Sequence, residues 1–179
     1  MKPALFIDRD GTINVNCPYC KNESEIKVYD DVYKPIAYLS KYFLIIIVTN
    51  QSGIARGYFT EDDLKRMNSK IVKLIRSHGV RIDAVYYCPH LPNSDCPCRK
   101  PNTGMVEKAM SEFDIDIKNS LVIGDDGNDI KMARRLGIKS ILVDRQEKNA
   151  DKLGADFVAK DFNDVLKIIK RMQRSSKHR

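Results

Sequence analysis

The sequence predicts an α/β fold in which helices cover both faces of a parallel sheet. Short runs of apolar and β-branched residues alternate along the chain with longer segments whose apolar residues recur at helical spacing. Continuous apolar runs are typical of strands that are buried on both faces. Polar residues directly follow three of these runs, which places them at the carboxyl edge of the sheet, where such folds bind ligands.

The first strand is expected at residues 4–7, an apolar run that leads into Asp8-Arg9-Asp10-Gly11-Thr12. Because strand side chains alternate between faces, Asp8 and Asp10 should project the same way, and Arg9 should point elsewhere. Two neighbouring carboxylates repel one another unless a metal cation or a shared proton compensates them. A solvated acidic turn is the alternative for these residues taken alone.

Residues 13–30 are polar and irregular, as expected of a loop or small flap, and contain Cys17-Pro18-Tyr19-Cys20. Such a pair of cysteines is compatible with half a zinc site, a redox pair, or two thiols without a special role. Five cysteines in a chain expected in the cytosol favour metal binding or chance over disulfides.

Residues that typically begin or end helices mark the elements that follow. Asp30 or Asp31 is expected to cap the first helix, Thr60 caps the second with Asp63 in its first turn, and Gly137 closes the fourth. The expected strands after the first are 43–49, 84–87, 120–124, 140–143 and 157–158, and the expected helices are about 30–41, 60–79, 103–113, 127–136 and 162–172.

Length and charge predict one domain, residues 1–170, followed by a basic tail. The 179 residues are enough for a sizeable core. The net charge of +7 invites a nucleic-acid ligand, but residues 171–179 hold four Lys/Arg and no acid, and without them the net charge is +3. We therefore expect a disordered tail and no nucleic-acid partner.

No apolar run approaches the ~20 residues that span a bilayer, and the N-terminal residues lack the apolar core of a signal peptide. A cytoplasmic protein without a membrane partner is expected. Nothing in the sequence indicates an obligate interface, so a monomer is expected.

Several of the polar residues at the expected sheet edge suit the transfer of a phosphoryl group. Asp8 and Asp125 offer hard oxygen ligands for Mg²⁺, to which Asp10 is expected to add its backbone carbonyl. Thr49 and Lys100 can bind phosphate oxygens by hydrogen bonds and charge. Asp8 can then attack phosphorus and form an aspartyl-phosphate. Asp10 can protonate the leaving oxygen and later deprotonate the hydrolytic water.

A second metal site is predicted in a short segment rich in proline and cysteine. Cys88, His90, Cys96 and Cys98 supply three thiolates and an imidazole within eleven residues, which suits a closed tetrahedral Zn²⁺ site. No coordination position is left for water, so this zinc should be structural. Reduced cysteines without a metal are the alternative.

The ordered set of motifs resembles the haloacid dehalogenase-like phosphohydrolase superfamily. Asp8-Arg9-Asp10-Gly11-Thr12 is similar to its first motif, Thr49 to its second, Lys100 to its third, and Gly124-Asp125-Asp126 with Asp129 to its fourth. The resemblance covers residues 4 to about 145. It implies a three-layer Rossmann-like fold and a Mg²⁺-dependent phosphatase. The loops at the site are too short for a large cap domain.

Within this superfamily the chain resembles the D-glycero-D-manno-heptose 1,7-bisphosphate 7-phosphatases. Residues 49–57 and 88–101 and the pair Gly104-Met105 carry the likeness, whereas histidinol-phosphatases, ranked second, usually lack the Gly-Met pair. The resemblance implies a sugar phosphate substrate whose 7-phosphate is removed. It implies substrate contacts at Asn16, Tyr19, Asn50, Gln51, Ser52, Arg56, Arg99, Lys100 and Asp126.

The chain departs from that family near the sugar. Residues 16–19 replace the usual Asp-His-Gly-Tyr and keep only Tyr19, and Asp31 stands where glycine is common. A nucleic-acid 3′-phosphatase, which an open site and a basic tail would suit, remains an alternative function. A non-catalytic binding module and a phospho-accepting signalling domain are disfavoured, because neither needs Asp8, Asp10 and Asp125 together with a zinc loop.

Overall fold

The computed structural model describes residues 1–147 and 153–176. In this part of the chain, six parallel strands form one sheet in the order β3-β2-β1-β4-β5-β6. The strands are β1 (Ala4–Ile7), β2 (Leu44–Asn50), β3 (Ala84–Cys88), β4 (Leu121–Gly124), β5 (Lys139–Val143) and β6 (Phe157–Ala159). The predicted α/β class and parallel sheet are confirmed.

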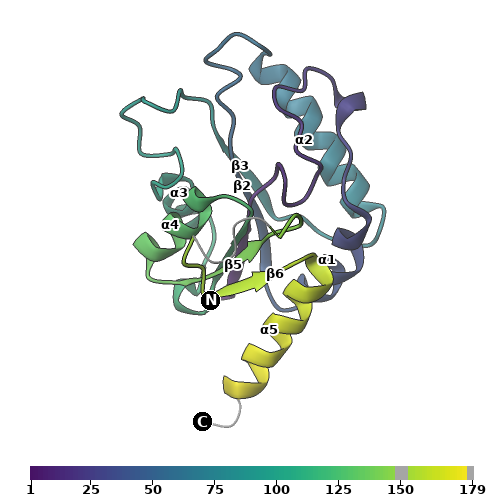
Figure 1. Cartoon of the computed structure of the whole chain (residues 1–179), viewed down its shortest axis with the longest axis vertical. Coiled ribbons are helices and arrows are strands. Elements are labelled where there is room, and N and C mark those ends of the chain that lie inside the picture. The colour runs from purple at the N-terminus through teal and green to yellow at the C-terminus, as the bar shows by residue number, and fades with distance from the viewer. Residues whose placement is uncertain (148–152, 177–179) are drawn as a thin grey trace.

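Helices cover both faces of the sheet. Figure 1 shows α3 and α4 on one side and α1, α2 and α5 on the other. The helices are α1 (Tyr33–Leu39), α2 (Glu61–Arg76), α3 (Gly104–Glu112), α4 (Gly127–Leu136) and α5 (Phe162–Ser176), with short 3₁₀ turns η1 (Glu23–Glu25), η2 (Asp30–Val32) and η3 (Ile117–Asn119). No cap domain is formed by the described residues.

The strand register gathers the polar residues at one edge. Leu5 and Ile7 of β1 pack under α1, α2 and α5, whereas Ala4 and Phe6 pack under α3 and α4. Ile7 pairs with Ile47 of β2 and with Ile123 of β4. Asp8 after β1, Thr49 and Asn50 at the end of β2, and Asp125 after β4 therefore lie at the same carboxyl edge of the sheet.

The first helix begins differently from the prediction. Neither Asp30 nor Asp31 caps it with its side chain, because both residues lie inside the 3₁₀ turn η2. The Asp31 carboxylate instead accepts a hydrogen bond from the backbone N–H of Phe162 at 2.8 Å and pairs with Arg145 at 3.0 Å. It therefore ties the end of the 13–30 segment to the start of α5. The predicted capping box of Thr60 and Asp63 on α2 is confirmed.

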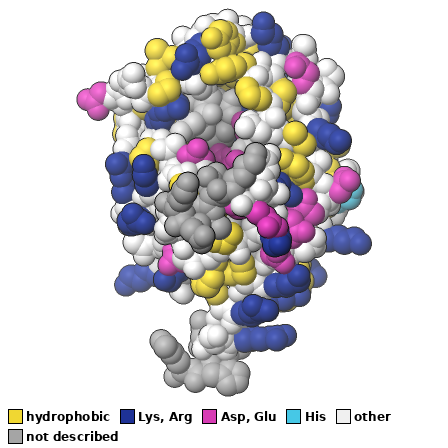
Figure 2. Space-filling model, in the orientation of Figure 1, with side chains coloured by type: hydrophobic (Ala, Val, Ile, Leu, Met, Phe, Trp, Pro, Cys, Tyr) yellow, Lys and Arg dark blue, Asp and Glu magenta, His cyan; other side chains and the backbone are white. Residues whose placement is uncertain are grey.

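The last helix is longer than predicted. We expected it to end near Met172 and residues 171–179 to be disordered, but α5 continues to Ser176. Met172 packs against the core beyond Ile169, so the apolar stripe of the helix extends into the basic segment. Basic side chains gather around this end of the molecule (Figure 2). Residues 177–179 lie outside the described part of the chain. No helix among the described residues is both long and apolar enough to cross a membrane.

Candidate active site

Lys100 connects two buried carboxylates at the carboxyl edge of the sheet. Its Nζ donates hydrogen bonds to Oδ1 of Asp8, to Oδ1 of Asp129 at 2.7 Å and to the backbone carbonyl of Val48 at 3.0 Å. Only 4% of Lys100 and 1% of Asp129 are exposed. A lysine with all three donors engaged inside the protein holds its ammonium at a fixed position.

The carboxylates of this site outnumber the lysine. Burial raises the pKa of Asp8 well above its ordinary value, and Lys100 offsets this only in part. Burial also raises the pKa of Asp125 to about 6, although a hydrogen bond from Thr12 opposes the shift. Burial lowers the pKa of Lys100, but Asp129 and Asp8 outweigh it and raise that pKa. The site therefore has an excess of negative charge that a bound cation would relieve.

The donor set fits a divalent metal. One carboxylate oxygen each from Asp8, Asp125 and Asp129 lies within 4.8 Å of the others, and hard oxygen ligands are those that Mg²⁺ takes. The first motif makes room for this approach. Gly11 has φ +86°, and a Cβ there would lie 2.1 Å from Oδ2 of Asp125. The hydroxyl of Thr12 donates to Oδ1 of Asp125 at 2.9 Å and orients that side chain.

Asp10, the expected general acid and base, is held by three side chains from two segments. The Arg9 guanidinium lies 2.7 Å from its Oδ2, so Arg9 turns back onto Asp10 instead of pointing elsewhere as we expected. Asn14 donates to Oδ1 at 2.9 Å, and Gln51 donates to Oδ2 at 2.7 Å. Gln51 also donates to the hydroxyl of Thr49 at 2.8 Å. These donors fix the orientation of the Asp10 carboxylate.

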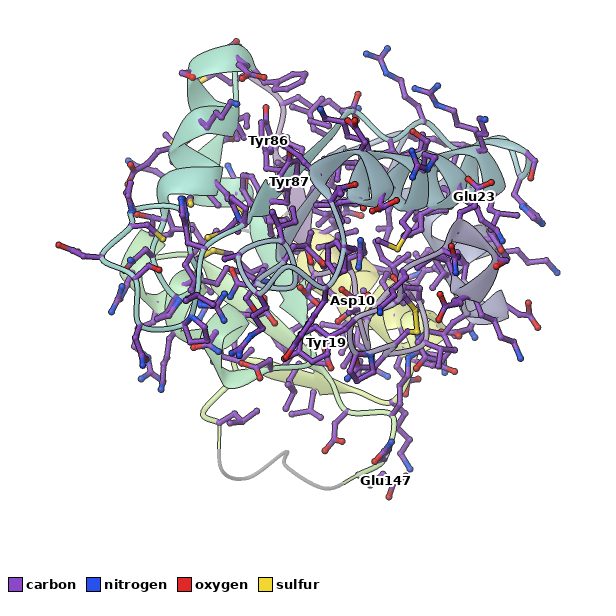
Figure 3. All side chains as sticks on the ribbon, turned by 90° about the horizontal axis from the view of Figure 1, so that it is seen from above. Asp10, Tyr19, Glu23, Tyr86, Tyr87 and Glu147 are labelled. Carbon is purple, nitrogen blue, oxygen red and sulfur yellow. A yellow bond between two sulfur atoms is a disulfide. The ribbon has the colours of Figure 1, made fainter. Side chains whose placement is uncertain are left out.

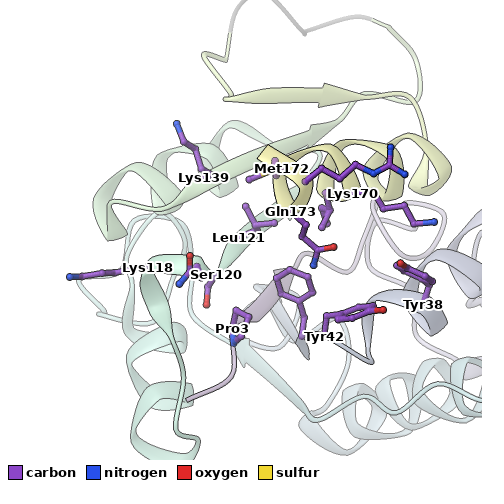
Figure 4. A pocket seen from close by; sticks show the side chains of 14 residues that line it. Pro3, Tyr38, Tyr42, Lys118, Ser120, Leu121, Lys139, Lys170, Met172 and Gln173 are labelled. Carbon is purple, nitrogen blue, oxygen red and sulfur yellow. The ribbon is translucent and has the colours of Figure 1, made fainter. Parts of the chain in front are cut away.

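The five residues expected to carry the chemistry line one cavity of about 220 Å³. They are Asp8, Asp10, Thr49, Lys100 and Asp125. A larger cavity of about 750 Å³ lies at the opposite edge of the sheet, between α1 and α5, with Tyr42, Lys118 and Lys170 in its lining (Figure 4). That cavity contains none of the five residues. We place the active site in the smaller one, where the carboxylates and the lysine converge.

The residues expected to contact substrate divide into two groups. Those that line the cavity are Asn16, Asn50, Arg99, Lys100 and Asp126. Arg99 donates a hydrogen bond to the backbone carbonyl of His90 at 3.1 Å, and Asn50 and Asp126 also have structural partners. The Asn50 side chain and the Lys100 backbone exchange hydrogen bonds of 3.0 and 3.1 Å, which positions the lysine. Asp126 caps α4 by accepting a hydrogen bond from the backbone N–H of Asn128 at 2.7 Å.

The residues of the second group do not line the cavity as the described residues form it. They are Tyr19, Gln51, Ser52 and Arg56. Gln51 bonds to Asp10 and Thr49 as described above. Tyr19 projects from the 13–30 segment, and its ring contacts that of Tyr58 at a centroid distance of 4.6 Å. Figure 3 labels Tyr19 together with Asp10 in a view from above.

Cys88, His90, Cys96 and Cys98 come together at the end of β3. The sulfur pairs that include Cys96 are 3.7 and 3.8 Å apart, and Nδ1 of His90 lies 3.5 and 3.3 Å from the sulfurs of Cys88 and Cys98. A tetrahedral zinc site requires separations of about 3.8 Å between sulfurs and about 3.5 Å between sulfur and nitrogen. The cluster is therefore compatible with zinc. Lys100 follows it after one residue.

Cys17 and Cys20 form a disulfide, with their Cα atoms 5.6 Å apart. Our expectation that the cysteines favour metal binding or chance over disulfides is wrong for this pair. The spacing left the pairing open, because two cysteines separated by two residues can bind a metal, form a bond or remain free.

Asp129 has two roles, and its pairing with Lys100 was not predicted from the sequence. The sequence placed Asp129 in the fourth motif. Its Oδ2 accepts a hydrogen bond from the backbone N–H of Asp126 at 3.3 Å in a capping box at the start of α4. Its Oδ1 also pairs with Lys100. Its place three residues after the cap identifies the first role. A buried lysine in need of a second carboxylate is the signal that could have identified the second role.

Comparisons with known proteins identify relatives of this chain. A HAD-hydrolase-like family profile matches residues 97–165. A probable D-glycero-D-manno-heptose-1,7-bisphosphate 7-phosphatase of Thermoplasma acidophilum is 48% identical over 75% of this chain and 85% of its own. The D-glycero-alpha-D-manno-heptose-1,7-bisphosphate 7-phosphatase of Campylobacter jejuni is 37% identical over 93% of this chain and 95% of its own.

A solved structure shows the same fold. The crystal structure of D,D-heptose 1,7-bisphosphate phosphatase from B. bronchiseptica, complexed with magnesium and phosphate, has a TM-score of 0.85 and 28% identity. The match covers 96% of this chain and 99% of that one. On these likenesses, the chain belongs to the D-glycero-D-manno-heptose-1,7-bisphosphate 7-phosphatase family of HAD-like hydrolases.

Proposed function

We propose that this enzyme removes the 7-phosphate of D-glycero-D-manno-heptose 1,7-bisphosphate through a phosphoaspartate at Asp8. The observation that carries the proposal is the convergence of Asp8, Lys100 and Asp125 on one cavity in a chain whose relatives bear that activity in their names. Asp8, Asp125 and the backbone carbonyl of Asp10 would hold Mg²⁺, which supplies charge neutralisation and Lewis acidity toward the phosphate.

The side chains divide the reaction between them. Asp8 attacks phosphorus while Thr49 holds a phosphate oxygen and the fixed ammonium of Lys100 stabilises the charge that spreads over the phosphoryl group. Asp10 delivers a proton to the departing sugar oxygen and then takes one from the water that hydrolyses the phosphoaspartate. Gln51 bonds to both Asp10 and Thr49, so it couples the acid–base group to the phosphate site.

The cavity limits how the substrate binds. Its volume of about 220 Å³ is below the ~300–1,000 Å³ typical of small-molecule pockets, so part of the sugar would lie on the surrounding loops. Residues 13–30, 50–58 and 88–101 form those loops. We assign Asn16, Tyr19, Ser52, Arg56 and Arg99 to the sugar and its second phosphate, and Asp126 to a sugar hydroxyl.

A substrate screen tests this assignment. We expect the highest kcat/KM for one anomer of heptose 1,7-bisphosphate, with heptose 1-phosphate as the product identified by mass spectrometry and phosphorus NMR. Relatives are named for each anomer, α in Campylobacter jejuni and β in Haemophilus influenzae, so both are assayed. A higher kcat/KM for histidinol phosphate, fructose 1,6-bisphosphate or a 3′-phosphorylated oligonucleotide would contradict the assignment.

Zinc removal should impair substrate binding. We propose that zinc at Cys88, His90, Cys96 and Cys98 holds the loop that presents Arg99 and Lys100 to the phosphate. Chelation followed by dialysis into magnesium is expected to lower kcat/KM by at least about 10-fold, the scale of losses when the groups that orient a site are disturbed. Added zinc, but not added magnesium, should restore it. Unchanged kinetics in a verified zinc-free sample would contradict this role.

We further propose that residues 1–170 are one phosphatase domain and that the chain acts as a cytoplasmic monomer. One continuous sheet supports the single domain, because both core clusters share its strands. The polar rim of the site is complete within one chain, so no second copy is needed to supply a catalytic group.

A further inference from the structure

The Cys17–Cys20 disulfide lies in the segment that connects the first motif to the substrate side of the active site. Two residues just before it reach the catalytic groups: Asn14 donates to Asp10 at 2.9 Å, and Asn16 lines the cavity. The disulfide closes the next turn of the same segment. Its position therefore determines how the chain leaves the cavity after Asn16.

The base of this segment is fixed independently of the disulfide. Asn14 bridges to Val28, and the backbone N–H of Val15 donates to the carbonyl of Lys27 at 2.8 Å. Cys20 is buried in the core, whereas residues 18 and 19 between the cysteines are exposed. Opening the disulfide would thus release the tip of the segment and leave its base in place.

The disulfide holds the turn that contains Tyr19 in an unusual backbone conformation. The Tyr19 φ of +60° lies in the left-handed region, which side chains other than glycine, asparagine and aspartate seldom adopt. The bond to buried Cys20 keeps the turn closed around it. The Tyr19 ring meets Tyr58 of the loop after β2, although 46% of Tyr19 and 44% of Tyr58 remain exposed. The pair joins the two loops and leaves aromatic surface available to a ligand.

We propose that the Cys17–Cys20 disulfide is a reversible redox switch that positions Asn16 and Tyr19 for the sugar and thereby controls KM. The proposal rests on the proposed phosphatase function. In the oxidised protein the loop is preorganised, and in the reduced protein it must be ordered again when substrate binds. The chemistry at Asp8 is not affected, because Asp8, Lys100 and Asp125 belong to the sheet edge and not to the loop tip.

The reductant is a dithiol. Cys17 is half-buried and Cys20 is buried, so a dithiol thiolate attacks the sulfur of Cys17, and the sulfur of Cys20 leaves as a thiolate that takes up a proton. The second thiol of the reductant then attacks the mixed disulfide. Cys17 is released as a thiol, and the reductant becomes a cyclic disulfide. Two electrons pass from the dithiol to the protein.

The test compares oxidised wild-type protein with protein treated with dithiothreitol in zinc-buffered solution. We expect KM for heptose bisphosphate to rise about 5-fold on reduction with kcat unchanged, as for a loop that must be ordered on binding. Alkylation and peptide mass spectrometry should show two thiols gained, at Cys17 and Cys20. A KM that does not respond to reduction would overturn the proposal, as would air-oxidised protein without the bridge.

A matched variant excludes an effect through the zinc loop. C17A/C20A keeps all four predicted zinc ligands, so it should bind one zinc per chain, show the KM of reduced wild type and ignore dithiothreitol. A KM that still rises with dithiothreitol in this variant would overturn the proposal. Should the variant fail to fold, the comparison of oxidised and reduced wild type decides alone.

Two further outcomes would lead to different conclusions, one about the switch and one about the substrate. One ligand atom each from Cys17, Cys20 and Glu25 lies within 4.8 Å of the others, so two zinc ions per wild-type chain with alkylation-resistant Cys17 and Cys20 would replace the switch by a metal site. If both redox forms hydrolyse another phosphate ester and not the heptose, the proposed substrate fails. The same KM comparison with that ester then decides on the switch.

Discussion

Replacing Asp8 by asparagine is expected to lower the rate of phosphate release by about 10⁴-fold or more, the scale of loss when a nucleophile is removed. An amide cannot form the phosphoaspartate, and it is a poor ligand for Mg²⁺. The fold should persist, because Lys100 keeps its bonds to Asp129 and to the carbonyl of Val48. Thermal unfolding should occur at an equal or higher temperature, since one of several crowded carboxylates has been neutralised.

The control for D8N is D116N, which makes the same chemical change far from the cavity. Asp116 caps the 3₁₀ turn η3 by accepting a hydrogen bond from the backbone N–H of Asn119. The amide oxygen of asparagine can still accept that hydrogen bond, so D116N should leave both the unfolding free energy and kcat nearly unchanged. Steady-state assays with phosphate detection, together with unfolding curves for both variants, test the pair. D8N protein that retains more than about 1% of wild-type kcat would contradict the assignment of Asp8 as nucleophile.

The sequence predicted the location of those site residues whose position follows from the strand order. Asp8 and Asp125 each follow a buried run, and parallel pairing of these runs brings both to one edge. The cluster of Cys88, His90, Cys96 and Cys98 was predictable for another reason, since these residues lie within eleven positions and need only a short loop to meet. In both cases chain connectivity limits the distance between the groups before the tertiary structure is known.

Contacts among polar side chains were not predictable in the same way. Spacing says that Arg9 and Gln51 lie near the site, but not that both bond to Asp10. Aspartate is a common helix cap, yet the Asp31 carboxylate binds Arg145 and the backbone at the start of α5 instead. These groups come close to Asp31 only when distant elements pack together. Such pairings depend on ångström-scale placement, which periodicity does not specify.

Lys100 should be as important for stability as for catalysis. Replacing it with methionine leaves Asp8 and Asp129 buried side by side without their shared cation. Removing one partner from a buried ion pair costs about 3–5 kcal/mol, because the remaining charge stays uncompensated. We therefore expect K100M to lose that much unfolding free energy in urea titrations without added magnesium. Its kcat should fall by about 10²–10³-fold, as when a charge-stabilising donor is lost.

The double variant K100M/D129N separates the two effects. Neutralising Asp129 removes one uncompensated charge while its amide oxygen can still accept the hydrogen bond from the backbone N–H of Asp126. The double variant should therefore be more stable than K100M, and its kcat should remain as low, because the phosphate still lacks its lysine. Non-additivity of the two substitutions is expected for residues in direct contact. If D129N gave no recovery of stability in the K100M background, Lys100 would not be the charge that allows these carboxylates to be buried together.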